Sequence, residues 1–206
     1  MTREEILQDL AYARSLAEEG RHAPLLGGGY LVFWGLLNAI AFTTHWAVLE
    51  GHLADLNGAA FPAVWIAYGV LAGIGMAILK TRARDKPGRT SIGVRAEAAM
   101  WQGAALAIGA VVIGSIGRLI VDADPMAPNA IFGAAFALYG AALYGTACLS
   151  QQTWLKAFAW LSFAVAGSLC LFANENWAYL NAAADSLAVL FVPGLRLLRS
   201  EPTSIV

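Results

Sequence analysis

Six long apolar segments follow one another along the chain, separated by shorter polar stretches. Each is close to the roughly 20 residues that an α-helix needs to cross the hydrocarbon core of a bilayer. Because lipid offers no partner to a free backbone amide, such segments cross as hydrogen-bonded helices. The pattern predicts an all-α integral membrane protein, a six-transmembrane-helix bundle, with spans at about 25–49, 60–79, 98–121, 130–149, 156–173 and 178–197.

The composition agrees with a membrane protein and leaves no room for a second folded domain. Hydrophobic residues make up 59% of the 206 residues and charged residues only 13%, whereas soluble domains carry about 25% charged residues. We expect three parts: a cytoplasmic amphipathic helix and hinge over 1–24, the membrane domain over 25–199, and a cytoplasmic tail over 200–206.

The positive charges lie on one side of the predicted bundle. All but one of the 13 Lys and Arg residues fall before the first span, in the 80–96 and 150–156 loops, or at the end of the chain. The positive-inside rule therefore predicts that both termini are cytoplasmic. Arginine outnumbers lysine, and alanine and glycine are abundant. We interpret this bias as bacterial, which predicts a location in the bacterial inner membrane.

The first 20 residues predict a separate amphipathic helix. Thr2 followed by Glu5 is a capping-box pattern at its start, and Gly20 is a natural stop at its end. Its apolar stripe begins with Ile6 and Leu10 at helical spacing, and most of its remaining surface is acidic. Helices that lie on membranes are usually rich in Lys and Arg, so we expect this stripe to pack on protein.

The loop between the second and third spans carries half of the twelve Lys and Arg residues on the predicted cytoplasmic side. Three interpretations of the tail helix stay open: it docks on this loop within the chain, it is a solvated tail, or it binds a cytosolic partner or another subunit. The loop also suits anionic lipid headgroups, and it lacks the interleaved aromatic residues typical of nucleic-acid binding. The candidate partner- or lipid-binding residues are Ile6, Leu10, Lys80, Arg82, Arg84, Lys86 and Arg89.

Polar side chains within the spans carry the strongest indication of function, because burying them in lipid costs free energy. Asp185 is the deepest acid, about 10 Å inside the last span at ~1.5 Å per residue. Further polar groups stand in the first and third spans, most of them in the outer half. Together they suggest a polar pocket that opens to the outside, with candidate ligand- or ion-binding residues Asp185, Asn181, Arg118, Asn38 and His45.

Three states of Asp185 stay open at this point. It forms a buried ion pair with Arg118, which would fix the third span against the sixth. Alternatively it is a carboxylate that binds a proton or a cation, with Asn181 and Asn38 as neutral ligands. In the third state it is a protonated acid that only donates a hydrogen bond, because burial favours the neutral form.

His45, His52 and Asp55 are weak candidates for a zinc or copper site, since His52 and Asp55 stand three residues apart near an outer loop. Solvated interface residues are the default interpretation, so we predict neither a metal nor a cofactor. The sequence contains no H-E-x-x-H or G-x-S-x-G motif. We therefore predict no catalytic residues and no enzyme activity.

Two classes of function remain. The first is a small-solute or ion transporter or channel, with an outward-facing polar pocket around Asp185. The alternative is a non-transporting regulatory or assembly protein, whose N-terminal helix and basic loop bind a protein partner. We favour transport slightly, because the outer polar residues recur on three spans. Homo-oligomers are compatible with both classes.

Overall fold

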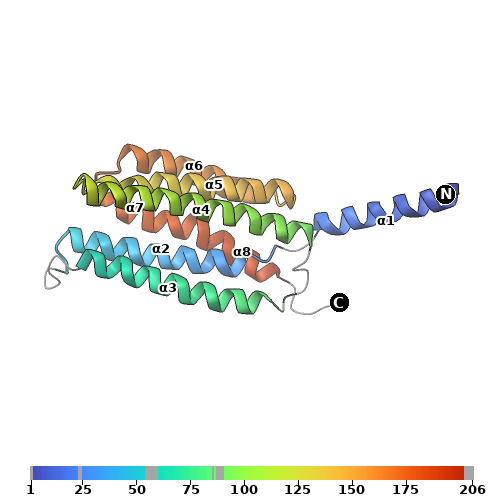
Figure 1. The fold of residues 1–206 in the computed structure, drawn as a ribbon, viewed down its shortest axis with the longest axis horizontal. Helices are drawn as coiled ribbons and strands as arrows, with labels where there is room; N and C mark the ends of the chain where they lie inside the picture. Colours follow the sequence, from blue (N-terminus) through green and yellow to red (C-terminus); the bar gives the residue numbers. More distant parts are fainter. Residues whose placement is uncertain (1, 23–24, 54–59, 85, 87–90, 202–206) are drawn as a thin grey trace.

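The computed structural model describes residues 2–22, 25–53, 60–84, 86 and 91–201. Every regular element in this part of the chain is a helix, and most of the helices lie side by side in one elongated bundle (Figure 1). The elements are α1 (Arg3–His22), α2 (Gly28–Leu49), α3 (Ala60–Ala83), α4 (Ile92–Val121), the 3₁₀-helix η1 (Ala127–Asn129), α5 (Ala130–Leu149), α6 (Leu155–Leu171), α7 (Trp177–Ser186), the π-helix η2 (Leu187–Phe191) and α8 (Val192–Ser200).

Five of these helical segments are long and apolar enough to cross a membrane. They are α2, α3, α4, η1 with α5, and the continuous segment of α7, η2 and α8. The remaining apolar helix, α6, has 17 residues, which is about 26 Å at 1.5 Å per residue. The prediction of an all-helical membrane protein is therefore confirmed, with five candidate spans and one shorter apolar helix.

The third predicted span and the tail helix have different ends in the structure. Helix α4 begins at Ile92, because the Ser91 hydroxyl caps its first turn by accepting from the Val94 N–H at 3.3 Å. Much of the predicted 80–96 loop is consequently helical, with Lys80 and Arg82 on α3. The predicted capping box is confirmed, since Thr2 N–H donates to Glu5 at 2.7 Å, but α1 continues two residues beyond Gly20.

Helix α1 projects away from the bundle at one end (Figure 1). The side chains of Ile6 and Leu10 are 50% and 66% exposed. The described residues therefore do not show the first interpretation, in which the tail helix docks on the basic loop of the same chain; part of that loop lies outside the described residues. The two interpretations that remain for α1 are a solvated tail and a helix that binds a partner.

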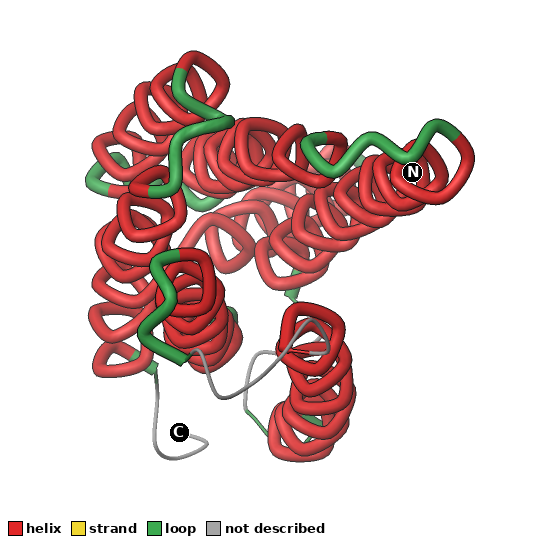
Figure 2. Tube along the Cα trace, turned by 90° about the vertical axis from the view of Figure 1, so that its left-hand side faces the viewer, coloured by secondary structure: helices red, strands yellow, loops and turns green. Residues whose placement is uncertain are grey.

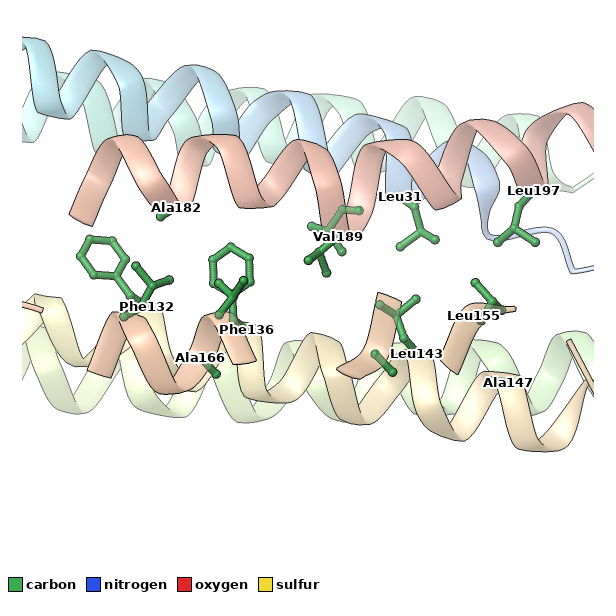
Figure 3. Close-up of a cluster of buried hydrophobic side chains, with 14 of the residues drawn as sticks. Leu31, Phe132, Phe136, Leu143, Ala147, Leu155, Ala166, Ala182, Val189 and Leu197 are labelled. Carbon is green, nitrogen blue, oxygen red and sulfur yellow. The ribbon is translucent and has the colours of Figure 1, made fainter. Parts of the chain in front are cut away.

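The hydrophobic core lies between α5 and α6 on one side and α2 with the last helical segment on the other. Figure 3 shows Phe132, Phe136 and Leu143 of α5 facing Leu31 of α2 and Val189 of η2. By contrast, α3 contacts the bundle through α2 and lies apart from the other helices (Figure 2). Ala60 is the only buried residue of α3. This arrangement leaves most of α3 facing the surroundings of the bundle.

Glycines bring α2 and the last helical segment into backbone contact. A Cβ atom added to Gly35 would lie 2.7 Å from the backbone nitrogen of Phe191, and one added to Gly194 would lie 2.7 Å from Val32 N. In lipid, such close approach replaces the hydrophobic drive that packs helices in water. The G-xxx-G pair of Gly69 and Gly73 on α3 instead has open space around it.

Candidate ion-binding site

Asp185 lies in the last turn of α7, immediately before the π-helix η2. Its carboxylate oxygen Oδ2 is buried and has no hydrogen-bond partner in the described part of the chain. Asn181 stands one helical turn earlier, is partly buried, and makes no side-chain hydrogen bond to another described residue. The two side chains thus offer an acidic oxygen and an amide oxygen at neighbouring positions of one helix.

The π-helix after Asp185 has a local cause in the sequence. A proline ring clashes with the carbonyl four residues earlier in an α-helix and supplies no N–H to it, and Pro193 is the second residue after η2, in the first turn of α8. The wider π turn over Leu187–Phe191 accommodates that proline. Single π turns inside membrane helices occur frequently at functional sites, so the irregular segment marks the position next to Asp185.

Arg118 does not pair with Asp185. Its guanidinium donates from Nη2 to Asp124 at 2.9 Å, and its Nε lies 3.6 Å from Asp122. The Arg118 side chain is 65% exposed, as expected for a residue at the end of α4. The buried ion pair between the third and sixth spans is therefore not formed, and Asp185 is left without a countercharge among the described residues.

The stability effects of changing Arg118 and Asp185 are expected to add. We predict that Arg118→Gln and Asp185→Asn together change the free energy of unfolding by the sum of the single effects, within about 0.5 kcal/mol. A double-mutant cycle by thermal or detergent unfolding measures this. Arg118→Gln with Asp124→Asn is the positive comparison, because that pair is bonded. Coupling of about 1 kcal/mol or more between Arg118 and Asp185 would restore the ion-pair interpretation.

Asn38 is committed to hydrogen bonds with two tyrosines. Its amide oxygen accepts from the Tyr68 hydroxyl at 2.7 Å, and its amide nitrogen donates to the Tyr139 hydroxyl at 3.3 Å. Asn38 is 2% exposed, so these bonds satisfy an amide that would otherwise be costly to bury. Asn38 thus ties α3 and α5 to α2, and its predicted role as an ion ligand competes with this structural role.

His45 belongs to an aromatic cluster near the C-terminal end of α2. Its Nδ1 accepts from the Trp65 indole N–H at 3.0 Å, and its ring stacks on Tyr179 with centroids 4.1 Å apart. The Tyr179 hydroxyl in turn donates to Asn129 at 2.8 Å. The cluster links α2, α3, η1 and α7. Among the predicted site residues, only Asp185 and Asn181 keep free ligand atoms.

The weak metal candidates do not assemble in the described residues. His52 is exposed beside the Trp46 ring, at a centroid distance of 5.4 Å, and Asp55 lies outside the described residues. Within the described part of the chain, no group of three or more His, Cys, Asp or Glu side chains is arranged to hold a metal ion. The geometry therefore offers an unpartnered acid rather than a metal centre.

The cations named as partner- or lipid-binding residues fall into two groups. Lys80, Arg82 and Arg84 are exposed at the end of α3, where they are free to meet lipid headgroups. Lys86 instead forms an ion pair with Glu201, and Arg89 lies outside the described residues. The basic segment is thus partly used within the chain.

Comparison with known protein families, with curated proteins and with solved structures finds no match for this chain.

Proposed function

We propose that the protein is a multi-pass transporter or channel that passes a proton or a small cation, with Asp185 as the ion-binding carboxylate. One observation carries the proposal: Oδ2 of Asp185 is buried without a hydrogen-bond partner in an apolar helix. An acid inside a membrane span is costly and is usually placed where it serves an ion pathway. Asn181 is the neutral neighbour that can share the ion.

The adjoining helix irregularity supports the same role. Ion and substrate sites of transporters are often built where a membrane helix departs from regular α geometry near the bilayer midplane. Here Asp185 precedes the π-helix η2 by two residues. The glycine contacts of Gly35 and Gly194 hold α2 against this segment, so an ion at Asp185 would sit beside a tightly packed helix crossing.

The proposed topology has six spans, because it counts the shorter helix α6 as a span in addition to the five long ones. Helices α5 and α7 begin at the same end of the bundle (Figure 1), so α6 runs back across it between them. In this topology the positive-inside pattern predicts that both termini are cytoplasmic and that α7 begins, at Trp177, on the outer side. A bacterial inner membrane is the proposed location, with the exposed cations of α3 facing anionic lipid.

Ion binding at Asp185 is expected to appear as ion-dependent stability. A ligand that binds only the folded state at about 100 times its Kd adds about 2.7 kcal/mol. Melting of the purified protein is measured over pH and in sodium, potassium, lithium or choline chloride at constant ionic strength. We expect a shift with pH or with one metal cation that Asp185→Asn removes and Glu175→Gln, an exposed acid at the start of α7, retains. Identical responses of wild type and Asp185→Asn would contradict the site.

A second function is favoured by a separate observation on α1. Ile6, Leu7 and Leu10 expose half or more of their surface on a helix that projects from the bundle. Exposed apolar side chains on an amphipathic helix suit a helix-in-groove contact. Glu4 and Asp9 make the polar side of the same helix acidic, so the fitting partner is a protein with an apolar groove rimmed by basic residues. This is the regulatory or assembly alternative.

A further inference from the structure

Two acids are buried together at the end of the bundle from which α1 projects. Glu97 of α4 is 4% exposed, and the side chain of Glu201, which follows α8, is 8% exposed. One oxygen of each, Glu97 Oε1 and Glu201 Oε1, is buried without a hydrogen-bond partner in the described part of the chain. The same short segment lies against both elements, because a Cβ atom at Gly27 would clash with Glu97 Oε1 and one at Gly28 would lie 2.5 Å from the backbone nitrogen of Leu198, near the end of α8. This cluster was not predicted from the sequence.

The remaining oxygens of the two acids are already bound. Glu97 Oε2 accepts from the Leu26 backbone N–H at 3.2 Å, and Glu201 Oε2 accepts from the Lys86 ammonium. Gly27 makes room for the first carboxylate, because a Cβ atom there would lie 2.3 Å from Glu97 Oε1. The cluster therefore joins the segment before α2, the start of α4, Lys86 and the end of α8.

Within the described residues, the charged groups bonded to the two acids do not neutralise them. Lys86 is the only described cation bonded to either acid, while Arg95 and Arg199, each two residues before one of the acids, have exposed side chains. Two ionised carboxylates and one ammonium leave one uncompensated negative charge in a buried place. Like charges that share a site disfavour ionisation of one partner, and an unpaired buried charge costs several kcal/mol.

We propose that Glu97 and Glu201 together bind one proton, which holds the segment before α2, α4 and the end of α8 in contact. A proton suits the site because it needs a single oxygen, whereas Ca²⁺ and Mg²⁺ need about six or more oxygen ligands and the cluster presents two. Loss of the proton leaves both acids charged, so the contact that anchors the root of α1 opens. The site lies away from Asp185, and the proposal does not depend on the function proposed there.

The proposed proton binding is tested by measuring the thermal unfolding of the protein in detergent over a pH series. An acid that holds its proton more tightly when folded gives stability at low pH that is lost as pH rises. Wild type is therefore expected to lose stability on raising the pH through the range in which the pair releases its proton. Glu97→Gln, which has the size of the neutral acid and cannot ionise, is expected to abolish this loss and to be the more stable protein at high pH.

Two controls make the result specific. Glu175→Gln is expected to keep the wild-type pH profile, and Asp185→Asn is expected to keep the part of the profile that Glu97→Gln removes. Infrared difference spectra should show a protonated carboxyl in wild type that is missing in Glu97→Gln. A Glu97→Gln protein with the wild-type profile and an unchanged carboxyl signal would overturn the proposal. So would stabilisation of wild type by Mg²⁺ or Ca²⁺ that Glu97→Gln abolishes, since the site would then hold a metal.

Discussion

Gly35→Leu is expected to destabilise the bundle by roughly 3 kcal/mol, the upper end of what overpacking usually costs, because the neighbouring atoms at this contact are backbone. A Cβ atom at Gly35 would already lie 2.7 Å from the backbone nitrogen and 3.0 Å from Cα of Phe191. Neither atom can rotate away, so α2 would have to separate from η2. Unfolding of the purified variant, by heat or by denaturing detergent, measures the loss.

The matched control is Gly69→Leu on α3. The same residue types are exchanged in another apolar helix, but a Cβ atom at Gly69 meets nothing within 4 Å. We expect the unfolding free energy of this variant to stay within about 0.5 kcal/mol of wild type, as for surface changes in general. Equal destabilisation by both variants would show that the α2–η2 crossing is not the tight contact described here.

The helical spans could be predicted from the sequence because lipid imposes a simple rule on length and polarity. The predicted segment 130–149 matches α5 to the residue. The start of the third span was missed by six residues because Arg95 and Glu97 interrupt the apolar pattern. The serine at position 91, which caps the helix, is a sequence signal that could have indicated where α4 begins. The segment 156–173 was predicted as a full span, but α6 has only 17 residues. Length alone is a weak criterion for a helix this close to the minimum that crosses a bilayer.

The partners of the polar residues were harder to predict than their positions. Asp124 is only six residues from Arg118. A chain that turns directly after the end of the helix could have indicated that Asp124 comes back to Arg118. The tyrosines that satisfy Asn38 stand 30 and 101 residues from it in the chain, and no local pattern joins them. Glu97 and Glu201 likewise meet only through the tertiary fold, because the segment before α2 contacts Glu97 of α4 and Gly28 lies against Leu198 of α8. Sequence periodicity says which helix face is polar, but not which faces meet.

Asp185→Asn is expected to abolish ion flux while leaving the protein folded. Asparagine has nearly the shape of aspartate and removes the charge that a proton or cation needs, and the packing of α7 around it is unchanged. The variant is expected to be as stable as wild type or more so, since removing an unsatisfied buried charge removes a cost of about 1–3 kcal/mol. A loss of transport with retained stability separates the ionic role of Asp185 from a structural one.

Flux through reconstituted vesicles tests the central claim most directly. Wild type, Asp185→Asn and Glu175→Gln are placed in proteoliposomes at equal protein content. Proton entry is followed with a trapped pH-sensitive dye and cation entry with ion-selective dyes, under an imposed membrane potential. Our account predicts flux of a proton or a small cation in wild type and Glu175→Gln, and the rate of empty vesicles in Asp185→Asn. Flux in Asp185→Asn equal to wild type, or none in folded wild type with every ion, would contradict it. Absence of flux in wild type would leave the partner-binding function of α1 as the one that the structure supports.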